Sequence, residues 1–296
     1  MESGYLEKNI LINGRYKVKQ KIDTGNTTIV YQGTDVLTKK RVAIKAESSN
    51  LGVETIPYES NTYRYLNNSN GFAQIFYAGQ EKGQNIIVME LLGVSMKHVH
   101  NEIGKRFCLK TVLELADQML MRLQIFHVHS VHCDLKPANF MMGAGDKSGK
   151  LYLVGFKFAR QNFHEQLHLN NQQFIGNPLF VARNVHMNKP LTALDDLESF
   201  GYVLVYFITG TLPWEPPATL TRDEQLKQIQ YMKLSCDLDK LCQGVPSVFY
   251  QYFQYIFGLQ SYEEPNYYYL RQIFRTLAAR LGYVYNHIFE WNAPSV

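Results

Sequence analysis

The 296-residue chain has few cysteines. The four, Cys108, Cys133, Cys236 and Cys242, include no Cys-x-x-Cys pair, so we expect neither a zinc site nor a disulfide framework. It also lacks a long apolar run, since the longest, near 203–208, is far shorter than a bilayer span. The first residues show no basic-then-apolar leader pattern. We therefore expect no membrane association and a reducing compartment, cytoplasmic or nuclear.

An excess of charge of either sign is also missing. The 30 basic and 26 acidic residues give a net charge of +4, too small and too mixed to argue for nucleic-acid binding. Apolar residues are plentiful: 46% of the chain, with 17 Phe and 20 Tyr. That is enough for the core of one bilobal domain over 1–296, which we expect to be a monomer.

The first ninety residues alternate apolar and polar positions between Gly and Asp turns, which predicts strands. The expected strands are 15–23, 29–35, 41–47, 75–79 and 86–91, with a helix at 54–66. The sequence thus predicts a small lobe at 15–91, made of a five-stranded sheet and one helix.

Beyond residue 92 the periodicity becomes helical. Helices are expected at 110–127, 195–209, 248–259 and 266–281. The first places its apolar side chains on one face: Val112, Leu115, Ala116, Met119, Leu120 and Leu123. The second is apolar nearly all round and should be buried. The fold class is therefore α+β, with a larger, mainly helical lobe at 92–292.

One polar stretch, 131–140, reads Val-His-Cys-Asp-Leu-Lys-Pro-Ala-Asn-Phe. The spacing of His132, Asp134 and Asn139 resembles the catalytic loop of protein kinases. The resemblance implies that Asp134 is the catalytic base, that Lys136 assists it, and that Asn139 is a metal ligand.

The second kinase metal motif, Asp-Phe-Gly, is only partly matched. Phe156 keeps the register of the motif, but Gly155 replaces the metal-binding Asp and Lys157 replaces the Gly. We therefore expect Mg²⁺ binding to be weak or absent.

The loop 22–30 compares with the phosphate-covering pattern Gly-x-Gly-x-x-Gly-x-Val. Aligned on Val30 and starting at Ile22, it keeps only the middle glycine, Gly25. Asp23 and Thr28 replace the outer two. An ordinary hairpin turn is an equally good interpretation.

The run 42–45, Val-Ala-Ile-Lys, matches the kinase strand whose Lys contacts the nucleotide phosphates. Its partner should be Glu59, with Glu54 as the second choice. Such a pair could equally be a structural salt bridge.

The segment 89–92 should join the two lobes and expose its backbone to an adenine. The residues expected around a bound ATP are Ala43, Met89, Glu90, Leu92, Met141 and Val154. The same side chains would serve equally well as ordinary core residues.

Ordered matches along 15–292 resemble the casein kinase I family of serine/threonine kinases. They are 88–93, 110–113, 116–119, 136–140, 174–176, 195–199, 201–204, 212–214, 269–272 and 289–292. The resemblance implies the bilobal protein-kinase fold, with Asp196 bracing the catalytic loop.

Several positions depart from that family. Cys133 stands where the family has Arg, and 158–176 contains no Ser, Thr or Tyr, so we expect no activation by phosphorylation there. Ala193 and Leu194 replace two arginines of an anion pocket that reads acidic substrates.

Three functions follow. We favour a pseudokinase that binds protein partners, with weak or no phosphotransfer. The alternative is an active serine/threonine kinase with a protein substrate. A small-molecule phosphotransferase is third, because the family resemblance extends into the substrate lobe.

Overall fold

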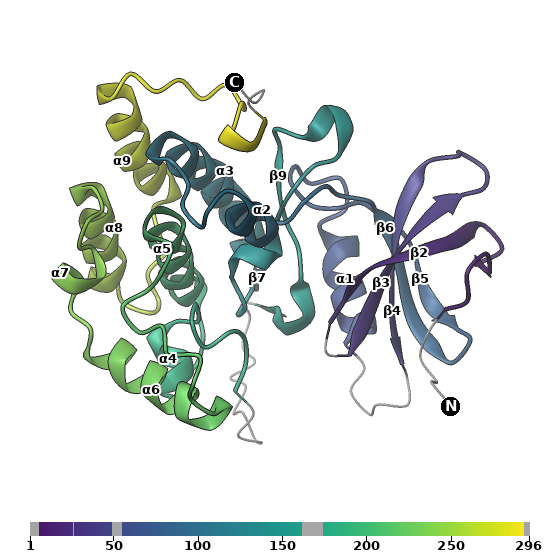
Figure 1. Cartoon of the computed structure of the whole chain (residues 1–296), viewed down its shortest axis with the longest axis horizontal. Coiled ribbons are helices and arrows are strands. Elements are labelled where there is room, and N and C mark those ends of the chain that lie inside the picture. Colours follow the sequence, from purple (N-terminus) through teal and green to yellow (C-terminus); the bar gives the residue numbers. More distant parts are fainter. Residues whose placement is uncertain (1–5, 26, 49–54, 162–173, 293–296) are drawn as a thin grey trace.

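The computed structural model describes residues 6–25, 27–48, 55–161 and 174–292. Figure 1 shows a small lobe of strands beside a larger lobe of helices, with the N-terminus on the former and the C-terminus on the latter. This is the α+β, bilobal arrangement that the sequence predicts.

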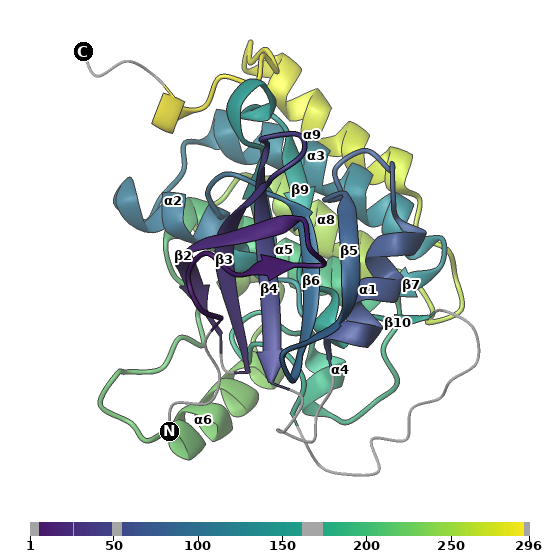
Figure 2. The same cartoon turned by 90° about the vertical axis from the view of Figure 1, so that its right-hand side faces the viewer.

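The small lobe is an antiparallel sheet in the order β1-β2-β3-β4-β6-β5, seen face-on in Figure 2. The strands are β1 Leu11–Ile12, β2 Tyr16–Thr24, β3 Thr28–Asp35, β4 Arg41–Ser48, β5 Ile75–Glu81 and β6 Gln84–Glu90. The predicted five strands are present, but the prediction of a five-stranded sheet is wrong. Strand β1 adds a sixth, and two residues are too few to show an alternating pattern.

Alternation along β4 decides which side chains face the helix of this lobe. Val42, Ile44 and Ala46 are buried in a small apolar cluster on one face. The side chain of Ala43 points to the other face of the sheet and belongs to the main core. Lys45, two residues further along, lies on the same face as Ala43. Helix α1, Ile56–Tyr65, covers that face and begins with Pro57 in its first turn.

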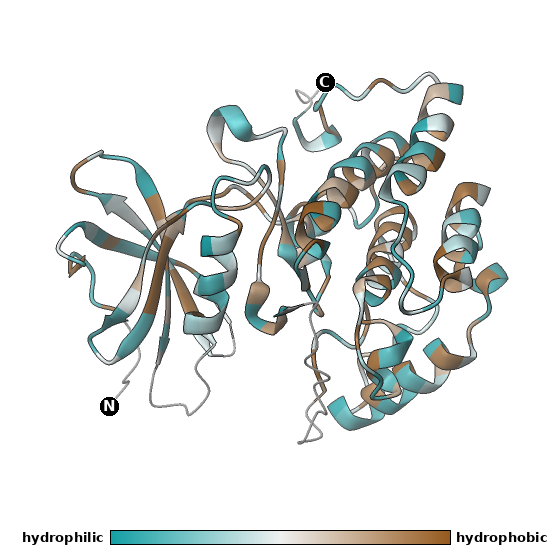
Figure 3. Ribbon diagram, turned by 180° about the vertical axis from the view of Figure 1, so that it is seen from behind, coloured by the Kyte–Doolittle hydropathy of each residue, from teal (hydrophilic) through white to brown (hydrophobic). Residues whose placement is uncertain are grey.

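The large lobe is built around two buried helices, α3 (Leu109–His127) and α5 (Ala193–Thr209). The six apolar residues predicted to share one face of α3 are all 0% exposed. Figure 3 shows hydrophobic residues along the central helices of this lobe. The remaining helices are α2 Met96–Glu102, α4 Arg183–His186, α6 Arg222–Ser235, α7 Leu238–Leu241, α8 Ser247–Gly258 and α9 Tyr267–Arg280.

Short strands and turns complete the large lobe. They are β7 Ser130–Val131, β8 Phe140–Met142, β9 Leu151–Leu153, β10 Arg160–Gln161, and the 3₁₀ turns η2 Pro137–Asn139, η3 Gly145–Lys147, η4 Phe156–Phe158 and η5 Glu290–Asn292. At the junction of the lobes, Gly93 N–H, just after the boundary, donates to Met142 O at 2.8 Å, and Leu153 N–H of the large lobe donates to Gly71 O of the small lobe at 2.9 Å. No helix within the described ranges is long and apolar enough to cross a membrane.

Candidate active site

The loop between β7 and η2 is held by one buried carboxylate, that of Asp196. Its Oδ2 accepts the N–H of His132 at 2.5 Å, and its Oδ1 accepts the N–H of Cys133 at 2.9 Å. The ring Nε2 of His127 lies 2.9 Å from the same Oδ2. Asp196 thus braces the catalytic loop, as expected from the sequence.

Cys133 has φ +64°, a left-handed conformation that is uncommon for a residue with a side chain. His132 beside it is fully buried, and this burial lowers the pKa of its imidazole. The neutral ring can donate from Nε2 to Val154 O, at 3.0 Å, and accept the Asp134 N–H at Nδ1, at 3.3 Å. These bonds, with the Asp196 bonds, over-determine the turn, so the strained Cys133 conformation persists.

The three predicted catalytic side chains come together at this turn. Lys136 Nζ lies 2.5 Å from Asp134 Oδ2, and the Nδ2 of Asn139 donates to Asp134 O at 2.7 Å. The other carboxylate oxygen of Asp134, Oδ1, accepts the N–H of Asn177 at 3.0 Å. Asp134 is therefore fixed at a defined position, with only 4% of its surface exposed.

Gly155, at the position of the kinase metal ligand, has φ +85°. A Cβ at this position would lie 2.6 Å from Asn139 Oδ1, so the Asn139 amide fills the space that a side chain would need. Asn139 offers one amide oxygen to a cation. The described residues contain no cluster of three or more His, Cys, Asp or Glu side chains able to hold a metal. Position 155 therefore offers no carboxylate, the protein group through which Mg²⁺ is usually held beside phosphates and water.

Lys157 reaches from η4 to the opposite lobe. Its Nζ donates to Thr27 Oγ1 at 3.2 Å, in the turn between β2 and β3. That turn is closed by the Gly25 N–H donating to Thr28 O at 2.7 Å, and the Asp23 carboxylate accepts the Thr24 N–H. The described residues of this loop form a tight hairpin turn, with a lysine from the other lobe bonded to it.

The predicted Lys45–Glu59 pair is confirmed, with 2.5 Å between Nζ and Oε2. Glu59 is 1% exposed, while the other candidate, Glu54, lies outside the described residues. One turn further along α1, the hydroxyl of Tyr63 accepts the Gly155 N–H at 3.4 Å. Burial, and then the nearby Glu59 carboxylate, raise the pKa of Tyr63. Helix α1 therefore connects the Lys45 pair to Gly155.

The residues predicted to surround an adenine divide into two groups. Val30, Ala43, Met89 and Leu92 belong to one apolar cluster. Met141 and Val154 are partly buried on the strand β8 and just after β9. Ile22 is 45% exposed, and Glu90, whose backbone is predicted to meet the adenine, pairs through its side-chain carboxylate with Lys147 at 2.5 Å.

Phe156 lies at the centre of an aromatic cluster between the lobes. Its ring stacks on that of Phe126 at 5.0 Å and meets the edges of Tyr63 at 4.7 Å and His132 at 5.5 Å. The sequence showed only that Phe156 keeps the register of a motif. Its role as a contact between α1 and the catalytic loop depends on residues far apart in the chain.

This two-lobed architecture, with an Asp–Lys–Asn loop in the large lobe and a Lys–Glu pair in the small lobe, defines a protein of the kinase class. The model of the protein kinase domain family matches residues 16–251, which is most of the chain. The chain therefore belongs to the protein kinase family.

Proposed function

We propose that the chain is a casein kinase I-like pseudokinase, which uses the kinase fold to bind and regulate protein partners and has weak or no phosphotransfer. The observation that carries this proposal is the state of position 155. Gly155 supplies no metal ligand, and the Asn139 amide occupies the space where a ligand side chain would begin.

The missing metal ligand affects the phosphate groups of the nucleotide rather than the attacking hydroxyl. Asp134 and Lys136, which would act on the attacking hydroxyl, keep their mutual contact. Phosphoryl transfer depends mostly on positioning and charge neutralisation, and metal ions supply much of the latter. The ammonium of Lys157 is a compact point charge, which could attract a phosphate but cannot replace octahedral coordination.

Nucleotide binding by the remaining features should be weak and nearly independent of magnesium. The Lys45–Glu59 pair and the apolar cluster with Ala43 and Met89 support a bound ATP. An active serine/threonine kinase remains the alternative, because Asp134, Lys136 and Lys45 all keep the contacts that such an enzyme requires.

Radiolabelled phosphate transfer to a casein-like protein distinguishes the two functions. Purified wild type and an Asp134→Asn control should both show little or no transfer. Wild-type turnover at the ~1–100 per second typical of kinases, lost in the control, would establish the active kinase instead.

The metal position can be tested by restoring it. The double substitution Gly155→Asp, Lys157→Gly adds the missing ligand and removes a competing cation, so nucleotide binding should become dependent on magnesium. Nucleotide titration by thermal shift, with and without magnesium or manganese, measures this. Asn139 must move in both variants, and the single Gly155→Asp change should have a smaller effect because the competing cation of Lys157 remains. Equal metal dependence in wild type and double variant would contradict the proposal.

A further inference from the structure

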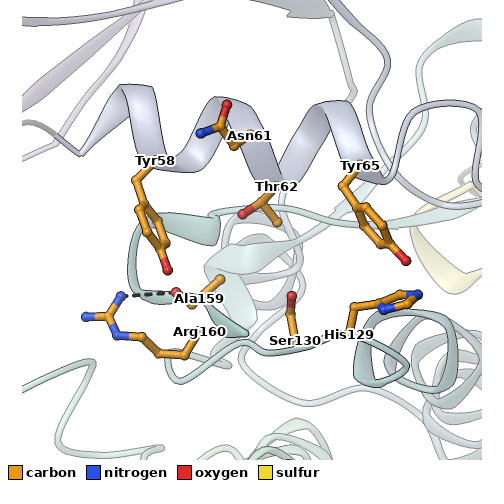
Figure 4. A pocket seen from close by; sticks show the side chains of 8 residues that line it. All are labelled: Tyr58, Asn61, Thr62, Tyr65, His129, Ser130, Ala159 and Arg160. Atoms are coloured by element: carbon orange, nitrogen blue, oxygen red, sulfur yellow. Dashed lines mark hydrogen bonds between the residues drawn. The ribbon is translucent and has the colours of Figure 1, made fainter. Parts of the chain in front are cut away.

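A cavity of about 380 Å³ lies between α1 and the β7–β10 pair (Figure 4). Its described lining residues are Tyr58, Asn61, Thr62, Tyr65, His129, Ser130, Ala159 and Arg160. The residues assigned above to the kinase site lie elsewhere. A volume near the lower end for ligand sites suits a single ring with one polar group.

The two ends of the cavity are aromatic. The Arg160 guanidinium lies 5.8 Å from the centre of the Tyr58 ring at one end, and the Tyr65 ring meets His129 edge-on at 4.5 Å at the other. Tyr58 and Tyr65 are 43% and 57% exposed, so their rings are accessible to a partner. Figure 4 shows both rings hanging from α1 toward the residues below. Exposed ring faces and edges of this kind favour another planar ring.

The polar side chains of the cavity can all donate hydrogen bonds, and Arg160 can only donate. Figure 4 shows Thr62 above Ser130, between the aromatic ends. None of the described lining residues is acidic. In the described part of the chain, Arg160 donates to Ala159 O at 3.0 Å and makes no ion pair. The rest of its guanidinium fork suits a phosphate or a carboxylate, which it can bind through two parallel hydrogen bonds.

Arg160 is held in place by the backbone. Strand β10 pairs with β7, so that Arg160 lies opposite Val131 and Gln161 lies opposite Ser130. The side chain of Arg160 is therefore presented by a paired strand and faces a helix of the other lobe. A ligand between them would contact both lobes.

From these features we propose that the cavity binds an aromatic ring bearing a phosphate or carboxylate group. The ring lies between Tyr58 and Tyr65, beside the hydroxyls of Thr62 and Ser130, and the anion pairs with Arg160 at the Tyr58 end. The ligand is either a free small aromatic acid or a phosphotyrosine side chain of a partner protein, since both carry the same chemistry.

Calorimetric titration with phenyl phosphate tests the site. Arg160→Gln should weaken binding at least about tenfold, because it removes a charged hydrogen-bonding partner, and Arg160→Lys should lie between it and wild type. Arg64→Gln is the matched control: it removes a positive charge from α1, the helix that lines the cavity, at a residue that donates to Asn61 Oδ1 and does not itself line the cavity. Binding unchanged by Arg160→Gln, or weakened equally by Arg64→Gln, would overturn the proposal.

Two further arms define the ligand and separate this site from the nucleotide site. An excess of ATP should leave phenyl phosphate binding unchanged, and competition between the two ligands would place phenyl phosphate in the kinase site instead. A phosphotyrosine peptide that binds more tightly than phenyl phosphate indicates a protein source, whereas the reverse indicates a small molecule. Inorganic phosphate or a phosphoserine peptide binding as tightly would show that the ring contributes nothing, which overturns the aromatic assignment.

Discussion

At the scale of single residues, the buried Glu59 carboxylate pairs with the Lys45 ammonium, and the stability of the fold depends on this pair. It is 1% exposed, and Lys45 Nζ lies 2.5 Å away. Removing one member of a buried pair leaves an uncompensated charge, which typically costs about 3–5 kcal/mol, whereas replacing both can be nearly neutral. We expect Lys45→Met to lower the free energy of unfolding by an amount near the bottom of that range, because the lysine is partly exposed.

Urea denaturation of Lys45→Met, Glu59→Gln and the double variant measures this coupling as a double-mutant cycle. The double variant should be more stable than Lys45→Met alone. Additive losses would show that the two side chains contribute independently, against the coupling described.

Single residues also mark how far the sequence alone could predict the site. Asp134, Lys136, Asn139 and the Lys45–Glu59 pair were predictable because fixed spacings carry them. The position of the Asn139 amide, in the space that a Cβ on residue 155 would need, was not predictable, because it depends on the left-handed turn at Gly155.

At the scale of elements, α6 supports the segment that follows Asn177. Lys233 of α6 is 1% exposed and donates from Nζ to Pro178 O at 2.6 Å and Val181 O at 2.7 Å. The rings of Trp214 and Tyr202 lie 5.1 Å and 5.3 Å from this ammonium. Trp214 also holds the segment, because its Nε1 donates to Leu179 O at 2.8 Å.

Burial lowers the pKa of Lys233 to about 7, against the opposing attraction of Glu198. Between this pKa and the ordinary lysine value near ~10.4, the unfolded chain binds more protons than the folded one. The free energy of unfolding should therefore gain a rising contribution between pH 7 and 9, and this contribution should vanish in Lys233→Met. Urea denaturation at a series of pH values measures it.

Lys189→Met, at an exposed lysine of the same lobe, is the matched control and should keep the wild-type slope. A slope that survives in Lys233→Met would mean that another group titrates in this range.

Helix α6 itself was not predicted from the sequence. Its 14 residues, Arg222–Ser235, are mostly polar, and only Ile229 and Lys233 are buried. The first turn is instead stabilised by a capping box between Thr221 and Glu224. Hydrophobic periodicity finds α3 and α5 because the core specifies them, and it misses a helix that contacts the core through few side chains.

At the scale of the whole molecule, the aromatic cluster around Phe156 joins the two lobes into one core. Phe156 is 0% exposed and contacts rings from α1, α3 and the catalytic loop. Phe156→Ala should lower the free energy of unfolding by about 3–5 kcal/mol, as for other buried aromatic truncations. Phe76→Ala, at a residue that is 41% exposed on β5, should change it by less than about 1 kcal/mol. Similar losses in the two variants, measured by denaturant unfolding, would contradict a central role for Phe156.

The two connections between the lobes, the chain that follows β6 and the hydrogen bond from Leu153 N–H to Gly71 O, also have a mechanical consequence. Two fixed points define an axis, so a rigid rotation of the small lobe about the line through them preserves both connections. Near one end of β4, Val42 pairs with Glu90, next to the first fixed point. Near the other end of β4, Glu47 pairs with Thr28 at the start of β3. The β2–β3 turn thus has a long lever arm about this axis, and the contact between Thr27 and Lys157 is among the first that such a rotation would break.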